Sequence, residues 1–315
     1  MYINSIGHYL PEQVIPNSYF QEQYGFHDKD IVEKSGIRER RKAQVSENTN
    51  TMALDATEAA LENLPYPIEE VNLIIGATYS PYDTVGTVAH TIQEKYKIAP
   101  AICLSLTAAC SSYCNALEIV QCFFATGKAT KALVVASEHN TRYCNENDPA
   151  SGFLWGDGAS AVFLSAEKIH EQDAKILDIK TNGLGHVGKS IRGVFLRPKD
   201  GGIRMPFGRD VFQQACIHMQ KEAEKILESN QFTVNDLTYL IPHQANLRII
   251  DYIRKSMKLT KRQVVVNLDK LGNTGCASSA IGLSQIYDQL KEDDIAVITV
   301  FGGGYSSGAV LIRKC

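Results

Sequence analysis

Three residues of this sequence have types and neighbours that could do covalent chemistry, and Cys110 is the first of them. It stands in "LTAACSSYCNAL", between small residues and just before a stretch with helical spacing. A cysteine at a helix N-terminus meets free backbone N–H groups and the positive end of the helix dipole, which favour the nucleophilic thiolate. The alternative interpretation is a small buried thiol packed among alanines.

His243 and Asn273 are the other two candidates. His243, in "LIPHQANLRII", follows an apolar run and would lie at the carboxyl end of a strand, where α/β proteins place their sites. Asn273, in "LGNTGCASSA", lies beside glycines that permit a tight turn, and its amide can donate two hydrogen bonds to a carbonyl oxygen. A structural histidine and an ordinary turn asparagine are the alternatives.

A run of glycines near the C-terminus is a fourth feature. In "FGGGYSSGA", 301–309, exposed backbone N–H groups would suit an oxyanion hole. A nucleotide-binding loop is disfavoured because no GxGxxG or GK[ST] pattern accompanies it. The eight cysteines include no CxxC pair with a nearby histidine, so we expect no metal site and no disulfide framework.

Composition places the chain among ordinary globular proteins. It has 315 residues, of which 44% are hydrophobic and 21% charged, with a formal net charge of -3. This balance gives no overall attraction to nucleic acid or to an anionic membrane. The start "MYINSIGHYLPEQ" lacks a cationic segment followed by an apolar run, and no apolar run of about 18 residues occurs. We therefore expect a cytoplasmic protein without nucleic-acid or membrane partners.

The elements that must position these residues can be read from hydrophobic patterning. Short apolar, β-branched runs predict strands buried on both faces, at 71–80, 131–138, 158–167, 237–246 and 294–304. The segments between them have helical length, which predicts an α/β protein with largely parallel sheets. Apolar residues at helical spacing after Cys110 predict a helix that ends near Gly127.

A weak internal repeat of motifs predicts that the chain consists of two similar halves. A buried strand ending in "GATYS" precedes "AACSSYCNAL" by about thirty residues, and "PHQAN" precedes "GNTGCASSAIGL" by a similar interval. The expected halves are 1–170, which holds the cysteine, and 171–315, which holds the histidine and the asparagine.

Taken together these motifs resemble β-ketoacyl-ACP synthase III of the thiolase superfamily. "AACSS", "PHQANLR", "GNTG" and "FGGGYSSGA" occur in that family's order, together with "GIRERR" at 36–41 and "GDGAS" at 156–160. The resemblance covers nearly the whole chain. The Cys-His-Asn set is specific, since elongating ketosynthases of the superfamily use Cys-His-His.

The resemblance implies a duplicated five-layer αβαβα fold, a homodimer and a ping-pong reaction without a bound cofactor. Cys110 would take an acyl group from a thioester carried by acyl carrier protein or coenzyme A. Decarboxylation of malonyl-ACP would then give the carbanion that forms the new carbon–carbon bond. His243 and Asn273 would bind the malonyl thioester carbonyl, and the N–H groups of Cys110 and Gly304 would form the oxyanion hole.

The segment "HQANLRIIDYIRKSMKLTKR" is the expected contact for the carrier protein or its pantetheine arm. It combines an apolar face with exposed basic residues, and Arg248 matches a family position near the pocket mouth. We assign this contact to Arg248, Asn246 and Lys255. The alternative is a solvated basic face without a partner.

The chain departs from acetyl-CoA-using members of the family at the positions that grip coenzyme A. Asp30 stands where they carry a tryptophan, and Lys34 and Pro149 where they carry arginines. Loss of a stacking ring and of charge-assisted hydrogen bonds predicts weak recognition of coenzyme A and a non-standard first acyl donor. Val85 aligns with a phenylalanine that the partner subunit inserts at the floor of the acyl pocket, so the smaller side chain predicts a larger acyl group.

Three other functions are compatible with parts of the pattern. An acyltransferase of the same fold would pass the acyl group to an oxygen, nitrogen or sulfur acceptor, with His243 as general base. A non-catalytic partner subunit would have no need of the intact Cys-His-Asn set. A degradative thiolase would carry a second catalytic cysteine in the glycine-rich region, where this chain has Tyr305 and two serines.

Overall fold

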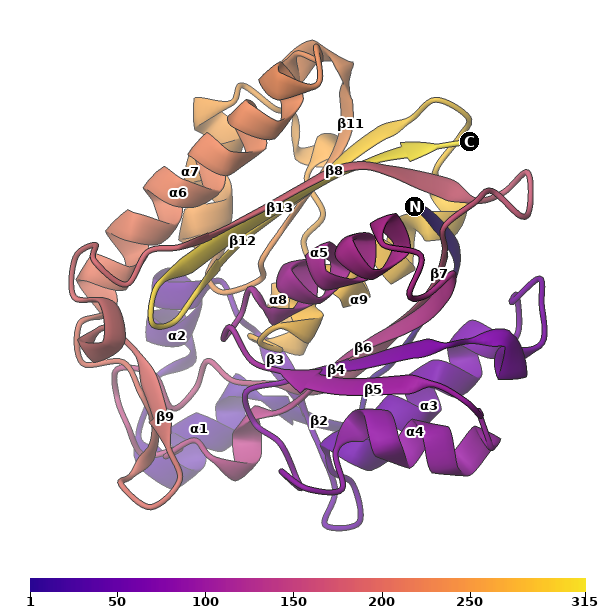
Figure 1. Ribbon diagram of the computed structural model, residues 1–315. Coiled ribbons are helices and arrows are strands. Elements are labelled where there is room, and N and C mark those ends of the chain that lie inside the picture. The colour runs from indigo at the N-terminus through magenta and orange to yellow at the C-terminus, as the bar shows by residue number, and fades with distance from the viewer.

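A computed structural model describes all residues, 1–315. One nine-stranded sheet runs through the molecule (Figure 1). Its strands are, in spatial order, β11 (Leu237–Pro242), β12 (Ile295–Gly302), β13 (Ser306–Lys314), β8 (Ala174–Gly183), β1 (Tyr2–Tyr9), β7 (Asp157–Ser165), β6 (Lys131–His139), β4 (Leu73–Ala77) and β5 (Ile102–Leu106). Two small hairpins lie outside it, β2 (Gln13–Pro16) with β3 (Glu39–Lys42), and β9 (Phe195–Arg197) with β10 (Gly202–Arg204).

The molecule has five layers, in which three layers of helices alternate with the two parts of this sheet. The central layer is α5 (Ser112–Ala125) with α9 (Ala277–Ile286), and α5 contacts both β4 and β6 below it and β8 and β13 above it (Figure 1). One outer layer is α3 (Thr49–Leu61) with α4 (Val88–Tyr96), and the other is α6 (Gly208–Ser229) with α7 (Leu247–Ser256) packed against it. The expected αβαβα arrangement is therefore present.

The remaining helices are short. They are α1 (Asn17–Tyr24), α2 (Asp28–Ser35) and α8 (Leu268–Leu271), together with single 3-10 turns at Ile68–Glu70, Asn140–Arg142, Ser190–Arg192, Val234–Asp236, Lys261–Gln263 and Tyr287–Gln289. None of the helices is both long and apolar enough to span a membrane. The cytoplasmic location stays a prediction.

The two halves of the chain repeat one strand order. Read toward the centre, β4-β6-β7-β1 in the first half corresponds to β11-β12-β13-β8 in the second. In each series the first two strands are parallel and the next two pairings are antiparallel. The series meet at β1 and β8 through only two residue pairs. We propose the boundary at residue 170, which falls in the connection from β7 to β8.

The prediction of largely parallel sheets is wrong. All five predicted strands are present, but within the large sheet only β4 with β5, β4 with β6, and β11 with β12 are parallel. The other five pairings are antiparallel. β7 and β13 return beside the strands that precede them, and a buried β-branched run has the same composition in either direction.

Packing explains why those strands are mostly apolar. Leu73 and Ile75 of β4 belong to the hydrophobic core around α5 and α9, whereas Ile74 belongs to the core under α3 and α4. Successive side chains of a strand point to opposite faces, so a strand between two helical layers has apolar side chains on both of its faces. The same arrangement buries every residue of β12 and every residue of β6 after Lys131.

Candidate active site

Cys110 lies in a tight turn between β5 and α5, two residues before the helix begins at Ser112. The hydroxyl of Ser112 accepts the N–H of Ala108 at 2.7 Å, and Ala109 has a φ of 50°, a left-handed conformation that an alanine rarely adopts. The end of β12 closes against this turn, because a Cβ added at Gly302 would lie 2.9 Å from the Cys110 nitrogen. The predicted helix is thus confirmed, with the cysteine at its N-terminal end.

His243 follows the last residue of β11 and is held on two sides. Its backbone N–H donates to the Thr299 carbonyl at 2.8 Å, and Nδ1 lies 2.7 Å from the hydroxyl of Ser278. That hydroxyl already accepts the Gln244 N–H, so its own proton is free to point at Nδ1. This arrangement leaves Nε2 carrying the imidazole proton.

Asn273 is fixed by hydrogen bonds at its backbone and at one atom of its side chain. Its N–H donates to the Leu154 carbonyl at 2.8 Å, and its own carbonyl accepts the Gly156 N–H at 3.0 Å. Its Oδ1 accepts the Gly275 N–H at 3.0 Å, and no protein group accepts from its Nδ2. The amide therefore presents its two N–H bonds as donors.

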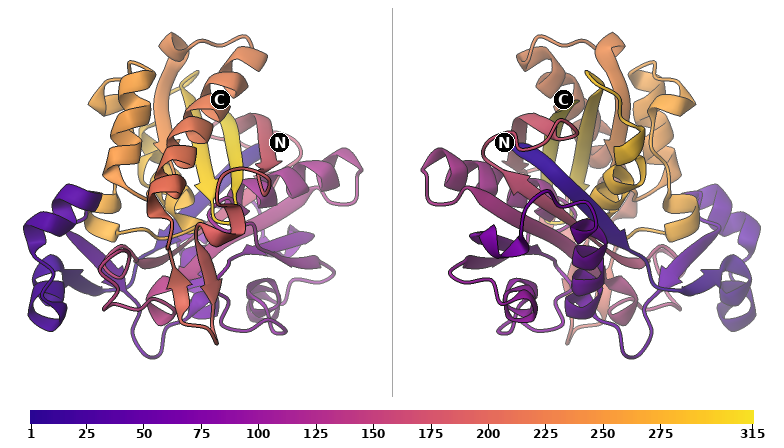
Figure 2. Two further views of the ribbon diagram at one scale, coloured as in Figure 1. Left: turned by 90° about the vertical axis from the view of Figure 1, so that its left-hand side faces the viewer. Right: turned by 90° about the vertical axis from the view of Figure 1, so that its right-hand side faces the viewer.

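One cavity of about 400 Å³ brings the three side chains together. Cys110, His243 and Asn273 all line it, as do the glycines 302–304 at the end of β12. Its other lining residues are mostly apolar. They include Val211, Ala215 and Met219 of α6, Ile249 of α7, and Phe195, Leu196 and Ile203 of the β9–β10 hairpin, which extends from the N-terminal end of α6 (Figure 2). Such a cavity can take an apolar chain and present a few polar groups at one end.

Burial sets the charge state of His243 and Cys110. Burial lowers the pKa of His243 to about 4, so the imidazole is neutral at physiological pH. Burial also raises the pKa of the Cys110 thiol to about 12, and the Glu138 carboxylate adds to this rise. The Gly303 N–H and the Tyr79 hydroxyl act in the opposite direction. The predicted stabilisation of the thiolate by the helix is therefore outweighed by burial in the free protein.

Cys110 is enclosed by protein atoms, yet part of its surface opens onto the cavity. An incoming thioester can reach the sulfur there. Gly304, the second expected oxyanion donor, lines the same cavity with a φ of 88°. A positive φ of this kind is accessible to glycine without strain.

The predicted carrier contacts lie on α7. Arg248 is exposed and its guanidinium stands over the Phe212 ring at 5.7 Å, and Lys255 is exposed near the end of the helix. Asn246 caps α7 by accepting the Arg248 N–H and donates to the Lys34 carbonyl of α2 at 2.9 Å. The helix reaches the cavity through Ile249, with Ala245 just before its start.

Val85 is not part of this chain's own cavity. It lies in the loop before α4 with 84% of its surface exposed. Its expected place at the floor of a partner's pocket stays a prediction.

Two groups near Cys110 were not singled out from the sequence. Tyr79 lines the cavity beside Cys110, and Glu138 at the end of β6 is completely buried. Both come from ordinary strand ends whose composition carries no signal. No group of three or more His, Cys, Asp or Glu side chains is arranged to hold a metal ion. The expectation that no cofactor is needed stays a prediction.

The fold and this site define a class of protein, the thiolase-fold acyltransferases. Family models lead to the same class. Residues 104–185 match the model for 3-oxoacyl-[acyl-carrier-protein (ACP)] synthase III, and residues 227–314 match the model for the C-terminal part of that enzyme.

Full-length relatives narrow the class to one family. β-Ketoacyl-[acyl-carrier-protein] synthase III of Haemophilus influenzae is 35% identical over 318 residues, which cover 99% of this chain and 98% of that one. The enzyme of Pasteurella multocida is 33% identical over 319 residues with the same coverage. The chain belongs to the β-ketoacyl-ACP synthase III family and is a condensing acyltransferase.

Solved structures agree with this placement. 3-Oxoacyl-[acyl-carrier-protein] synthase III from Aquifex aeolicus superposes with a TM-score of 0.92 at 32% identity, covering 99% of both chains. The priming β-ketosynthase of the R1128 polyketide pathway superposes with a TM-score of 0.89 at 26% identity, covering 99% of this chain and 96% of that one.

Proposed function

We propose that this enzyme starts acyl chains by a ping-pong condensation with Cys110 as its nucleophile. The observation that carries the proposal is the cavity in which a cysteine at a helix N-terminus meets two side-chain donors without protein acceptors, His243 Nε2 and Asn273 Nδ2. In the first half-reaction the Cys110 sulfur attacks an acyl thioester and the carrier thiol leaves. The N–H groups of Cys110 and Gly304 stabilise the tetrahedral oxyanion.

In the second half-reaction the two donors act on malonyl-ACP. Hydrogen bonds from His243 and Asn273 to the thioester carbonyl oxygen stabilise the enolate that forms as carbon dioxide leaves. The enolate carbon then attacks the acyl group, and the Cys110 sulfur departs. A neutral imidazole and an amide suit this step, because both donate hydrogen bonds without taking the proton of a substrate.

The first acyl donor is larger than acetyl and is carried by a protein. Three observations support this proposal. Asp30 is exposed on α2, and α2 packs against α7. The helix α2 contains no aromatic residue that could stack on adenine. Lys34 is a single point charge where a guanidinium would bind phosphate at two points. The cavity walls from the β9–β10 hairpin are apolar, with Phe195, Leu196 and Ile203.

Acyl carrier protein docks on α7, and two copies of the chain form a dimer. The basic residues Arg248 and Lys255 complement the acidic surface of such a carrier. β5 is the outermost strand of the sheet and is paired only with β4, so its free edge can face a second copy. Within that dimer Val85 enters the partner's acyl pocket.

Intact-protein mass spectrometry tests the proposal. The protein and Cys110→Ala are incubated with acyl-CoAs and acyl-ACPs of several chain lengths. We expect an adduct with acyl-ACP of medium chain length that the variant lacks, and its discharge to a β-ketoacyl product on addition of malonyl-ACP. An adduct that is discharged by alcohols or amines but not by malonyl-ACP would instead indicate an acyltransferase. No adduct from any donor would contradict the proposal.

A further inference from the structure

Tyr79 follows β4 and places its ring in the wall of the cavity, next to the nucleophile. Its hydroxyl oxygen is buried and completes no hydrogen bond of standard geometry with any protein group. Tyr79 and Cys110 line the same cavity, and the hydroxyl acts to lower the pKa of the Cys110 thiol. A buried hydroxyl without a partner costs free energy, so its retention beside a reactive sulfur calls for an explanation.

Space for this hydroxyl exists because residue 275 is a glycine. A Cβ added at Gly275 would lie 2.4 Å from the Tyr79 hydroxyl oxygen and 2.9 Å from Cγ of Glu138. Gly275 also has a φ of 60°, and its N–H orients Asn273. One glycine therefore serves both the condensing amide and the position of the tyrosine.

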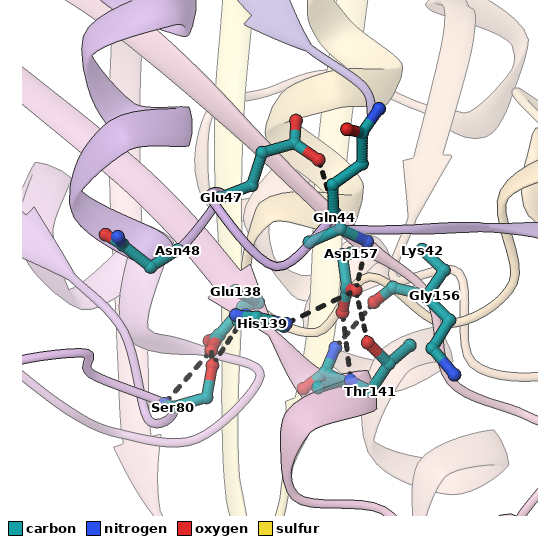
Figure 3. Close-up of polar contacts among 12 residues, drawn as sticks. Lys42, Gln44, Glu47, Asn48, Ser80, Glu138, His139, Thr141, Gly156 and Asp157 are labelled. Carbon is teal, nitrogen blue, oxygen red and sulfur yellow. Dashed lines mark hydrogen bonds and ion pairs between the residues drawn. The ribbon is translucent and has the colours of Figure 1, made fainter. Parts of the chain in front are cut away.

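Glu138 anchors the turn that carries the tyrosine. Its carboxylate accepts the backbone N–H of Tyr79 at 3.2 Å and that of Ser80 at 3.1 Å. It also accepts the hydroxyl of Thr78 at 3.1 Å and the hydroxyl of Ser80, as Figure 3 shows for Ser80. These four donors fix the backbone on both sides of the tyrosine ring, so Glu138 acts as a positioning residue.

The ionisable groups around the sulfur come from four elements. Tyr79 follows β4, Glu138 is the penultimate residue of β6, and His243 follows β11. Cys276 precedes α9, and its thiol donates to the Ala77 carbonyl at 3.3 Å. No lysine or arginine lines the cavity. A thiolate at Cys110 must therefore be stabilised by uncharged donors.

From this geometry we infer that Tyr79 is a further catalytic residue, whose hydroxyl donates a hydrogen bond to the Cys110 sulfur when the thiolate forms and when it departs. The tyrosine keeps its own proton, since burial and the neighbouring Cys110 and Glu138 hold the pKa of the phenol well above 10. The inference rests on Cys110 being the nucleophile of the proposed reaction.

Site-resolved alkylation tests the inference without any acyl substrate. The rate of Cys110 modification by iodoacetamide is measured at fixed pH between 7 and 9 for the protein and for Tyr79→Phe, using the mass of the peptide that contains residue 110. Loss of one donor to a charged sulfur lowers the thiolate fraction by about ten-fold. Because a more basic thiolate is also more reactive, the rate itself is expected to fall roughly three-fold.

Two further variants separate this role from a structural one. Tyr143→Phe is the matched control, because it removes a tyrosine hydroxyl that binds the same loop, through the Pro81 carbonyl at 3.0 Å, but that does not line the cavity. We expect it to alkylate at the rate of the unmodified protein. Glu138→Gln keeps an acceptor for the Tyr79 N–H, and the hydroxyls of Thr78 and Ser80 can turn to accept from its NH2 group. It removes a negative charge near the sulfur, so we expect faster alkylation above pH 7.

A slower alkylation of Cys110 in Tyr79→Phe and a faster one in Glu138→Gln cannot both result from a loosened fold. A rate for Tyr79→Phe equal to that of the unmodified protein would overturn the inference. If Tyr79→Phe does not fold, Gly275→Ala takes its place, since its added Cβ displaces the same hydroxyl, and an unchanged rate there has the same meaning. An alkylation change without any acyl adduct would count against the proposed function alone.

Discussion

At the scale of single residues, Asn273 has one orientation available to its amide, because Oδ1 is already bound to the Gly275 N–H. Asn273→Asp preserves shape and replaces the free donor by a carboxylate oxygen, which repels an enolate. We expect the condensation rate on the pre-formed acyl-enzyme to fall by about 10² to 10³, the cost of one oxyanion donor. Acylation of Cys110 is expected to continue, as measured by adduct mass, and loss of both steps together would contradict the assigned role.

Glu138 gives a second prediction at this scale, concerning stability and pH. Burial raises the pKa of this carboxyl to about 7, against an ordinary value of about 4.3. The folded protein therefore holds this proton more tightly than the unfolded chain, and its stability falls as pH rises between these two values. Glu138→Gln lacks the ionisation. By urea denaturation, the variant should gain up to about 3 kcal/mol relative to the unmodified protein between pH 4.5 and 8. If the unfolding free energies of the two proteins change in parallel over this pH range, the prediction is wrong.

At the scale of elements, sequence periodicity placed α5 and the strands β4, β6, β7, β11 and β12, since a buried apolar pattern is local information. It could not give strand direction, because parallel and antiparallel buried strands have the same composition. The role of Tyr79 was also out of reach. It depends on Gly275, almost two hundred residues away, leaving space for the hydroxyl, and on Glu138 from a neighbouring strand.

The helix α7 carries the prediction that belongs to this scale. Ile249, Ile250 and Ile253 bury one face, which leaves Arg248 and Lys255 on the exposed one. This separation fits a docking surface for an acidic carrier protein. Reversing both charges, Arg248→Glu with Lys255→Glu, should raise the KM for malonyl-ACP about ten-fold and leave kcat unchanged.

A single charge reversal at a remote position tests whether that effect is local. Lys128→Glu changes an exposed charge just beyond the C-terminal end of α5, about 20 Å along that helix from the nucleophile. Its KM should stay at the value of the unmodified enzyme. An equal rise of the KM for malonyl-ACP in both variants would indicate a general effect of net charge. An unchanged KM in both would contradict a docking role for α7.

At the scale of the whole molecule, the free edge of β5 and the exposed Val85 loop are surfaces that a single copy leaves uncovered. Ile102 of β5 is 38% exposed. An exposed strand edge with apolar residues tends to pair with another chain. We expect sedimentation at twice the chain mass of 34.8 kDa. Ile102→Glu should shift the protein toward the monomer, because each copy would bring a buried charge to the contact. A monomer in the unmodified protein would exclude the proposed dimer.

A mixed dimer then tests whether Val85 acts in the partner's pocket. Val85→Trp should block the longest acyl groups in both sites of its own dimer, since the larger side chain fills the pocket floor. Mixing it with Cys110→Ala, which lacks the nucleophile, creates a dimer whose one working Cys110 faces an unaltered Val85 from the other copy. If the valine acts across the interface, long-chain acylation returns in the mixture, up to one site in each mixed dimer. If it acts within its own chain, the working site still carries the tryptophan and no long-chain adduct forms.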